Sequence, residues 1–366
     1  MTGKIGHLEL VVLMTLTIVG TAFVELPRYM AMRAEQSGWI SVALGALGGL
    51  IVVFVLCWLA RRFPGKTLVG YAEAILGRPL GKLVSIAFAT LLLVIAGMLI
   101  REFAYTIIIA TQPMTPDSLL VAVFVLLVAY QIYWGLEVIA RVAVTFLPYI
   151  FISPVLVTFG TLGYVKLGRY LPLLGTGLGP VLKASFYASM YYSEMVLAAM
   201  ILPRVRACTP ARTRRALILA LGLAVPPLTA VTASCIGVFG PSETSRLVSP
   251  ALELARLVTF GESVQRMEAL FVVFWMLAAM VKIGIFTWSS IEAIAETLGL
   301  VNYRALIPGG SLLLYLLAML PENIWDEQAE RGAMVKIMPY VLVGLPLLLA
   351  LLAWVTKKKG AEASES

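Results

Sequence analysis

The chain has 366 residues, of which 60% are hydrophobic and only 13% are charged, and its mean hydropathy is +0.94. About a quarter of the residues of a soluble domain are charged, so this composition excludes an ordinary soluble protein. The net charge of +8 needs no nucleic-acid partner, because membrane topology and contact with anionic lipid headgroups account for it.

Ten apolar segments each hold about the 20 residues that a membrane-spanning helix needs. In chain order they are residues 8–32, 38–60, 83–111, 117–135, 142–165, 180–202, 216–239, 267–289, 306–321 and 334–355. We therefore expect an all-α integral membrane protein whose ten transmembrane helices form a single bundle over residues 1–355. The polar tail, 356–366, is expected to be disordered.

The first apolar segment carries a candidate break at mid-membrane. Gly20 is a weak helix former, and Pro27 follows within two turns. Unwound backbone at this depth is tolerated only where protein buries it or where it lines a cavity. A kinked but continuous helix is the alternative. A cleaved signal peptide is disfavoured, because Glu9 would lie in its apolar region.

The distribution of Lys and Arg predicts that both termini are cytoplasmic. Cations cluster in the loops after the second and sixth helices and in the tail, which ten spans would place on one side: Arg61, Arg62, Lys66, Arg78, Lys82, Arg204, Arg206, Arg212, Arg214, Arg215, Lys357, Lys358 and Lys359. The opposite side holds Glu322, Asp326, Glu327 and Glu330.

Several kinds of chemistry lack the residues that they need. The only histidine is His7, and the three cysteines, Cys57, Cys208 and Cys235, have neither metal-ligand nor redox spacing. Residues 65–67 resemble the end of a P-loop, but Ala60 replaces its first glycine and no strand precedes it. We therefore expect no enzyme, no metal site and no cofactor.

Ionisable side chains within spans are expensive and mark functional candidates. Arg101 and Glu102 lie in the third predicted helix, Glu194 in the sixth and Lys282 in the eighth. They could form a buried structural ion network, or one pair could act as a gate or contact a ligand. Tyr105 shares a helix face with Arg101 and could line the same cavity. Glu102 and Glu194 are equally plausible partners for Lys282.

With ten spans, two halves of five helices, about 8–165 and 180–355, would have opposite orientations. The first and sixth helices are then counterparts, and both carry a polar interruption, at Gly20-Thr21 and at residues 189–194. Paired interruptions of this kind indicate a transporter-type binding site. Helix N-termini would bind a carboxylate, and Glu194 would bind an ammonium, so a zwitterionic amino acid fits.

The sequence resembles the B subunit of GerA-type spore germinant receptors, a branch of the amino acid–polyamine–organocation superfamily. The resemblance rests on short segments whose order and spacing match over about 280 residues: Ile18-Val19-Gly20-Thr21 with Leu26-Pro27, Gly38-Trp39-Ile40-Ser41, Phe63-Pro64-Gly65-Lys66-Thr67-Leu68, Tyr71-Ala72-Glu73-Ala74-Ile75-Leu76-Gly77, Arg101-Glu102-Phe103, Met114-Thr115-Pro116, Arg169-Tyr170-Leu171-Pro172-Leu173-Leu174-Gly175, Arg266-Met267-Glu268 and Phe274-Trp275.

This resemblance implies a LeuT-like fold of five plus five helices with breaks in helices one and six. It implies a home in the spore inner membrane, A and C partner subunits, and germination in response to a small germinant such as an amino acid. The implied germinant site comprises Gly20, Thr21, Ala22, Tyr191, Ser193 and Glu194.

One residue departs from the family pattern: Glu25 stands where an apolar residue is expected. Two other functions remain open, because a fold does not fix a function. One is a secondary active amino-acid transporter coupled to a proton or sodium ion, and the other is a conduit for water or ions.

Overall fold

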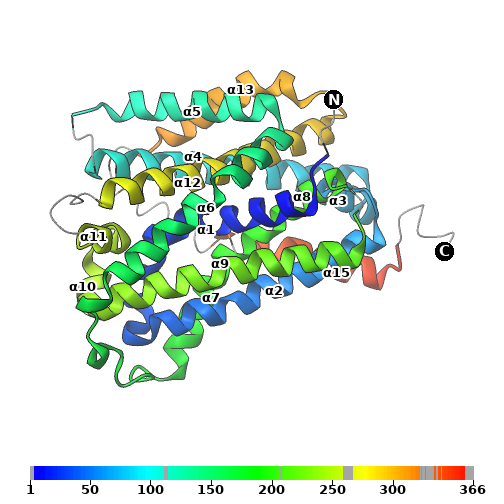
Figure 1. Ribbon diagram of the computed structural model, residues 1–366. Coiled ribbons are helices and arrows are strands. Elements are labelled where there is room, and N and C mark those ends of the chain that lie inside the picture. Colours follow the sequence, from blue (N-terminus) through cyan, green and yellow to red (C-terminus); the bar gives the residue numbers. More distant parts are fainter. Residues whose placement is uncertain are drawn as a thin grey trace.

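The computed structural model describes residues 4–358 apart from 111–113, 207, 259–266, 322, 324–325, 327–333, 335–336 and 339. Over the described residues the chain is helical, and an isolated parallel bridge joins Ile5 to Val205. The long helices lie side by side and together form one elongated bundle (Figure 1).

The elements of the first half are connected by short segments. They are α1 (His7–Ala34), η1 (Glu35–Ser37), α2 (Gly38–Arg62), α3 (Leu68–Leu76), α4 (Arg78–Ala110), α5 (Asp117–Trp134), α6 (Leu136–Gly160), η2 (Leu162–Tyr164) and η3 (Leu167–Tyr170). Gly135 alone separates α5 from α6, and its positive φ of 88° is a conformation that glycine adopts without strain.

The second half contains more short helices. They are α7 (Leu178–Ser193), η4 (Glu194–Leu197), α8 (Ala198–Ile201), η5 (Leu202–Arg204), α9 (Pro210–Phe239), α10 (Pro241–Arg246), α11 (Pro250–Arg256), α12 (Met267–Leu298), η6 (Tyr303–Leu306), α13 (Ile307–Ala318) and α15 (Gly344–Val355).

Each predicted span has a helical counterpart among the described residues. Six stretches are long and apolar enough to cross a membrane, and the first of them contains both α1 and α2. The remaining spans correspond to the interrupted α7 and to two shorter apolar helices, Tyr303–Ala318 and Tyr340–Val355. Of the tail, residues 359–366 lie outside the described residues, as do Glu322, Glu327 and Glu330.

The helix ends differ from the predicted bounds. α4 begins at Arg78, α6 at Leu136 and α9 at Pro210, and α12 continues to Leu298. These helices extend past their apolar stretches because polar residues continue a helix readily once it leaves the hydrocarbon region. The short helices α3, α10 and α11 were not predicted, because none is long enough to give an apolar span.

α1 lies at the centre of the bundle. It packs against α6, α7, α9, α10 and α12, and in Figure 1 the dark-blue α1 runs between the α4–α12 layer and the α7–α9 layer. Other extensive pairings are α2 with α7, α4 with α12 and α5 with α13. In a five-plus-five repeat the counterparts are α1 and α7, α2 and α9, α4 and α12, and α5 and α13. When each helix is replaced by its counterpart, the α2–α7 contact becomes the α9–α1 contact, and the α4–α12 and α5–α13 contacts stay the same. The observed contacts therefore have the symmetry that such a repeat requires. The bounds of the two repeats stay a prediction.

The break predicted at Gly20-Thr21-Ala22 is wrong, because α1 is continuous from His7 to Ala34. Gly20 serves a close helix contact instead. A Cβ atom at Gly20 would lie 2.9 Å from Cβ of Lys282 and 3.0 Å from the carbonyl oxygen of Ala278. The missing side chain therefore lets α12 approach α1 closely, as small residues do in membrane bundles.

The sixth span is interrupted, as predicted, but at Glu194–Leu197 rather than at residues 189–194, because residues 189–193 are regular α-helix. α7 ends at Ser193, a 3₁₀ segment follows over Glu194–Leu197, and α8 then continues the span. The backbone dihedral angles at Ser193 and Ala198, which flank this segment, stay in the right-handed helical region. The span is therefore tightened at Glu194 and not unwound into an extended segment.

Candidate ligand-binding site

A cavity lies where α1, α4, α7 and α12 meet, and it encloses about 500 Å³ of empty space when its open mouth is included. Its polar lining consists of Thr21, Glu25, Glu102, Tyr191, Glu194 and Lys282. Every one of these side chains comes from a membrane-spanning segment, where polar groups are rare and are kept for function.

Lys282 connects three elements of the bundle. Its Nζ lies 2.8 Å from Oε1 of Glu194 on η4, and it donates a hydrogen bond of 3.0 Å to Oγ1 of Thr21 on α1. The side chains of Lys282 and Glu194 are only 1% and 4% exposed. A charge this deeply buried is tolerated because a partner of opposite charge lies beside it. The structure thus pairs Lys282 with Glu194 rather than with Glu102.

Glu194 retains an acceptor that the described residues do not use. Its Oε1 faces Lys282, while its Oε2 is buried and has no hydrogen-bond partner within the described part of the chain. A buried carboxylate oxygen without a partner is costly. Because Glu194 lines the cavity, a ligand with a cationic donor would satisfy it.

Glu25 and Tyr191 form a second polar contact at the cavity. The hydroxyl of Tyr191 donates a hydrogen bond of 3.0 Å to Oε2 of Glu25. Farther along α1 and α7, the rings of Tyr29 and Tyr187 lie 5.5 Å apart, and the Arg33 guanidinium lies 3.7 Å from the centre of the Tyr187 ring. Glu25 is therefore built into the α1–α7 contact, in a stripe of polar and aromatic groups that leads away from the cavity.

The rest of the cavity wall, among the described residues, is apolar and rich in methionine. It consists of Ile95, Met98, Leu99, Met190, Met334 and Met338. Methionine is flexible and polarizable, so such a wall adapts to apolar groups of different shapes. These residues were missed in the sequence, because a methionine within an apolar span gives no distinguishing signal.

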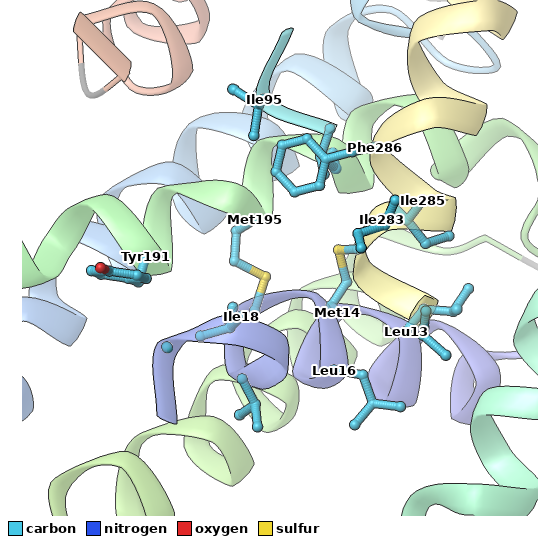
Figure 2. Packing of buried hydrophobic residues seen from close by; sticks show 14 of the residues in the cluster. Leu13, Met14, Leu16, Ile18, Ile95, Tyr191, Met195, Ile283, Ile285 and Phe286 are labelled. Carbon is cyan, nitrogen blue, oxygen red and sulfur yellow. The ribbon is translucent and has the colours of Figure 1, made fainter. Parts of the chain in front are cut away.

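The elements that carry Thr21, Glu194 and Lys282 meet in the hydrophobic core. Figure 2 shows Met14 and Ile18 of α1 beside Met195 of η4 and Ile283 of α12. All four side chains are fully buried. Close packing around the ion pair holds its members at fixed positions, because protein interiors are packed as densely as crystals.

The structure places five of the predicted residues in the cavity lining: Thr21, Glu102, Tyr191, Glu194 and Lys282. The other predicted residues lie elsewhere. Gly20 occupies the contact with α12, and Ala22 is buried in the core. The Ser193 hydroxyl donates to the carbonyl oxygen of Met190 at 2.5 Å.

Arg101 belongs to a separate polar cluster. Its guanidinium lies 2.8 Å from Oδ2 of Asp117, donates a hydrogen bond of 2.8 Å to the carbonyl oxygen of Pro321, and lies 4.4 Å from the centre of the Tyr105 ring. The predicted network of four charges is therefore divided: Arg101 pairs with Asp117, and Lys282 pairs with Glu194. Asp117 was missed because it stands at the predicted end of a span, where acidic residues are common.

At the end of the bundle where α1 begins, residues near the start of the chain form hydrogen bonds with the segment after the sixth span. The N–H of Ile5 donates to the carbonyl oxygen of Arg204 at 3.0 Å, and the carbonyl oxygen of Ile5 accepts from the N–H of Arg206 at 2.8 Å. Arg204 also forms an ion pair with Glu292 of α12, and its guanidinium lies 5.0 Å from the centre of the Trp288 ring. These contacts tie the beginning of α1 to α12 and to the end of the sixth span.

Comparison with known sequences identifies relatives along nearly the whole chain. The family model described as spore germination protein matches residues 4–327. Spore germination protein YndE of Bacillus subtilis is 23% identical over 367 residues, which cover 98% of each chain. Spore germination protein KB of the same organism is 24% identical over 371 residues, covering 99% of this chain and 97% of its own.

Solved transporter structures share the fold. MHP1, a nucleobase-cation-symport-1 family transporter, superposes with a TM-score of 0.75 at 15% identity and covers 97% of this chain and 79% of its own. MhsT in complex with L-phenylalanine superposes with a TM-score of 0.67 at 16% identity, and the match covers 96% of this chain and 89% of the MhsT chain. At these identities the likeness establishes the fold, which is LeuT-like, and leaves the activity open.

Proposed function

This chain belongs to the spore germination protein family, and we propose that it is the membrane subunit of a nutrient-germinant receptor that holds its germinant in the cavity around Lys282. The observation that carries this proposal is the buried Oε2 of Glu194, which faces no donor among the described residues and lies beside the only cation of the described cavity lining. The proposed ligand is an amino acid, since its ammonium and carboxylate match these two charges.

The cavity offers a complementary group for each part of such a ligand. The ammonium would bind Glu194, the carboxylate would bind Lys282, and the side chain would contact the methionine-rich wall formed by Met98, Met190 and their neighbours. Charge-assisted hydrogen bonds of this kind are stronger than neutral ones. Thr21 is the site residue that would hold the ligand-bound end of Lys282 against α1.

Binding would signal by changing the contacts of Lys282. This side chain holds α1 to η4 through Thr21 and Glu194, so a ligand that takes over one of these partners loosens that connection. A ligand shifts a conformational equilibrium only as far as it binds the two states differently. The proposed receivers of the shift are A and C subunits, in the spore inner membrane with both termini of this chain in the cytoplasm.

The test uses purified protein in liposomes and measures binding and uptake of labelled L-alanine and other amino acids in the same samples. A receptor subunit binds a ligand saturably without accumulating it. Saturable uptake driven by a proton or sodium gradient would identify a transporter, the function of several structural neighbours, and would overturn the receptor proposal.

A matched pair of variants links any binding to the cavity. Thr21→Val removes the hydroxyl beside Lys282 at nearly constant volume, and it should weaken binding. Thr232→Val removes a buried hydroxyl whose hydrogen bond among the described residues is to the carbonyl oxygen of Leu228, within α9 itself, and it should leave binding unchanged. Equal affinity in both variants would remove Thr21 from the site.

A further inference from the structure

A second cavity lies at the end of the bundle where α2 ends and α9 begins. It encloses about 550 Å³ including its mouth. Cys57 and Arg61 line it from α2, Lys66 from the following loop, Tyr71 from α3, Cys208 from the segment before α9, and Thr213 from the first turn of α9. The described linings of this cavity and the central cavity have no residue in common, and nothing in the proposed receptor mechanism uses this second cavity.

The lining of this cavity is cationic. Arg61 and Lys66 contribute two positive charges, and the described lining contains no Asp or Glu. The 30-residue α9 begins at Pro210 on its wall, and the side chain of the N-cap residue, Thr209, does not cap the helix. The free N–H groups of a helix start carry partial positive charge, which adds to the field of the two side chains.

Tyr71 supplies an unused hydrogen-bond donor. Its side chain is 1% exposed and lines the cavity, yet its hydroxyl makes no hydrogen bond to any described residue. Burial raises the pKa of this phenol well above its ordinary value, so the hydroxyl stays protonated at neutral pH. A hydroxyl that has no partner among the described residues and lines a cationic cavity is suited to an anionic acceptor.

The segment that carries Lys66 is held in place by neighbouring elements. Thr67 caps α3 by accepting the N–H of Gly70 at 3.2 Å, and it donates a hydrogen bond of 2.6 Å to Glu296 of α12. The buried ring of Phe63 lies 6.0 Å from that of Tyr71. The backbone that carries Lys66 is therefore held in place, whereas the exposed side chains of Arg61 and Lys66 would be ordered by the anion.

We propose that this cavity binds a phosphate-bearing anion through Arg61, Lys66 and the Tyr71 hydroxyl. Both cations can pair with phosphate oxygens, and the start of α9 favours the same negative charge. The group can belong to a phospholipid headgroup or to a soluble phosphate, and these two sources share one recognition chemistry. In either case the anion joins the ends of α2 and α9, two helices that pack against each other.

Cys208 provides a local reporter of occupancy. It lines the cavity and is exposed, whereas Cys57 and Cys235 are buried. Alkylation of each cysteine can be followed separately by peptide mass spectrometry. The full chain would be held in a maltoside detergent, which carries no phosphate, and titrated with inorganic phosphate, with chloride at equal ionic strength as the reference. A parallel sample without phosphate would contain phosphatidylglycerol.

Saturable slowing of Cys208 alkylation by phosphate alone would identify a soluble ligand, and slowing in phosphatidylglycerol alone would identify a lipid headgroup. Both results support the site. An equal rate in phosphate, in phosphatidylglycerol and in chloride would overturn it.

Variants distinguish the cavity from general surface charge. Arg61→Gln combined with Lys66→Gln should abolish the protection, and Tyr71→Phe should weaken it while keeping the ring beside Phe63. Arg212→Gln combined with Arg215→Gln is the matched control, because these exposed cations lie on the first turns of α9 outside the cavity lining. If the control variant loses the protection of Cys208 to the same extent, the protection comes from general surface charge and not from the cavity. Amino-acid binding at the central cavity should be unchanged in all these variants.

Discussion

Lys282 on α12 and Glu194 on η4 form an ion pair of 2.8 Å at the centre of the bundle, and both side chains are almost completely buried. Lys282 reaches this position along Gly20, because the absence of a side chain there leaves room for the Cβ and Cδ atoms of the lysine. The ion pair and the close contact of α1 with α12 are therefore one structural feature.

Removal of Lys282 should destabilise the protein strongly. Lys282→Ala leaves the Glu194 carboxylate buried without its cation, and breaking a buried pair on one side costs about 3–5 kcal/mol. Thermal unfolding in detergent should show a clearly lower Tm than that of the exposed control variant Lys183→Ala. A Tm of Lys282→Ala equal to that of the control would mean that water solvates Glu194.

Glu194→Gln should weaken amino-acid binding, and it should also lower the Tm, because Lys282 then lies buried without its counter-charge. The amide oxygen still accepts a hydrogen bond from Lys282, but the charge that attracts a ligand ammonium is lost. Hydrogen bonds to charged groups contribute about 1.5–3 kcal/mol, so we expect a rise in Kd of about tenfold or more. Equilibrium binding measures it, with Glu253→Gln, in the exposed pair with Arg256, as control. An unchanged Kd would exclude Glu194 from the site.

Gly20→Ala should disturb the α1–α12 contact, because the new Cβ would lie 2.9 Å from Cβ of Lys282. Overpacking of this kind costs about 1–3 kcal/mol, and it should also lower ligand affinity by displacing Lys282. Gly222→Ala is the matched control: a Cβ there meets nothing within 4 Å, and alanine favours the helix. If both variants unfold at the same temperature, the contact at Gly20 is looser than described.

Tyr191 and Glu25 should act as one unit in ligand binding. Tyr191→Phe and Glu25→Gln each break or weaken the 3.0 Å hydrogen bond between α7 and α1. The effects of residues in direct contact are not additive, so the double variant should bind little worse than the poorer single variant. A double-mutant cycle measures this: the ligand affinity is determined for the wild type, the two single variants and the double variant. If the losses of binding free energy in the single variants add up to the loss in the double variant, the two side chains act independently.

Hydropathy and rare intramembrane charges made much of this structure predictable. The spans follow from apolar length, and Glu194, Lys282 and Glu102 reach the cavity as their burial cost suggested. Gly20 was misread because glycine at mid-membrane serves equally as a break or as a close contact, and only the partner helix decides. The pairing of Arg101 with Asp117 depends on how α4 meets α5, which no local pattern encodes.

The bridge from Ile5 to Val205 joins a segment that is synthesised early to one that is synthesised much later. Ile5 lies just before α1, and its partner Val205 leaves the ribosome about 200 residues later. Until Lys282 is made, later still, Thr21 has no lysine beside it, and Gly20 lacks its contact with α12. The central helix of the finished bundle is thus among the first to be made and among the last to be enclosed, and truncated chains that end before Lys282 should be recognised and degraded as unassembled.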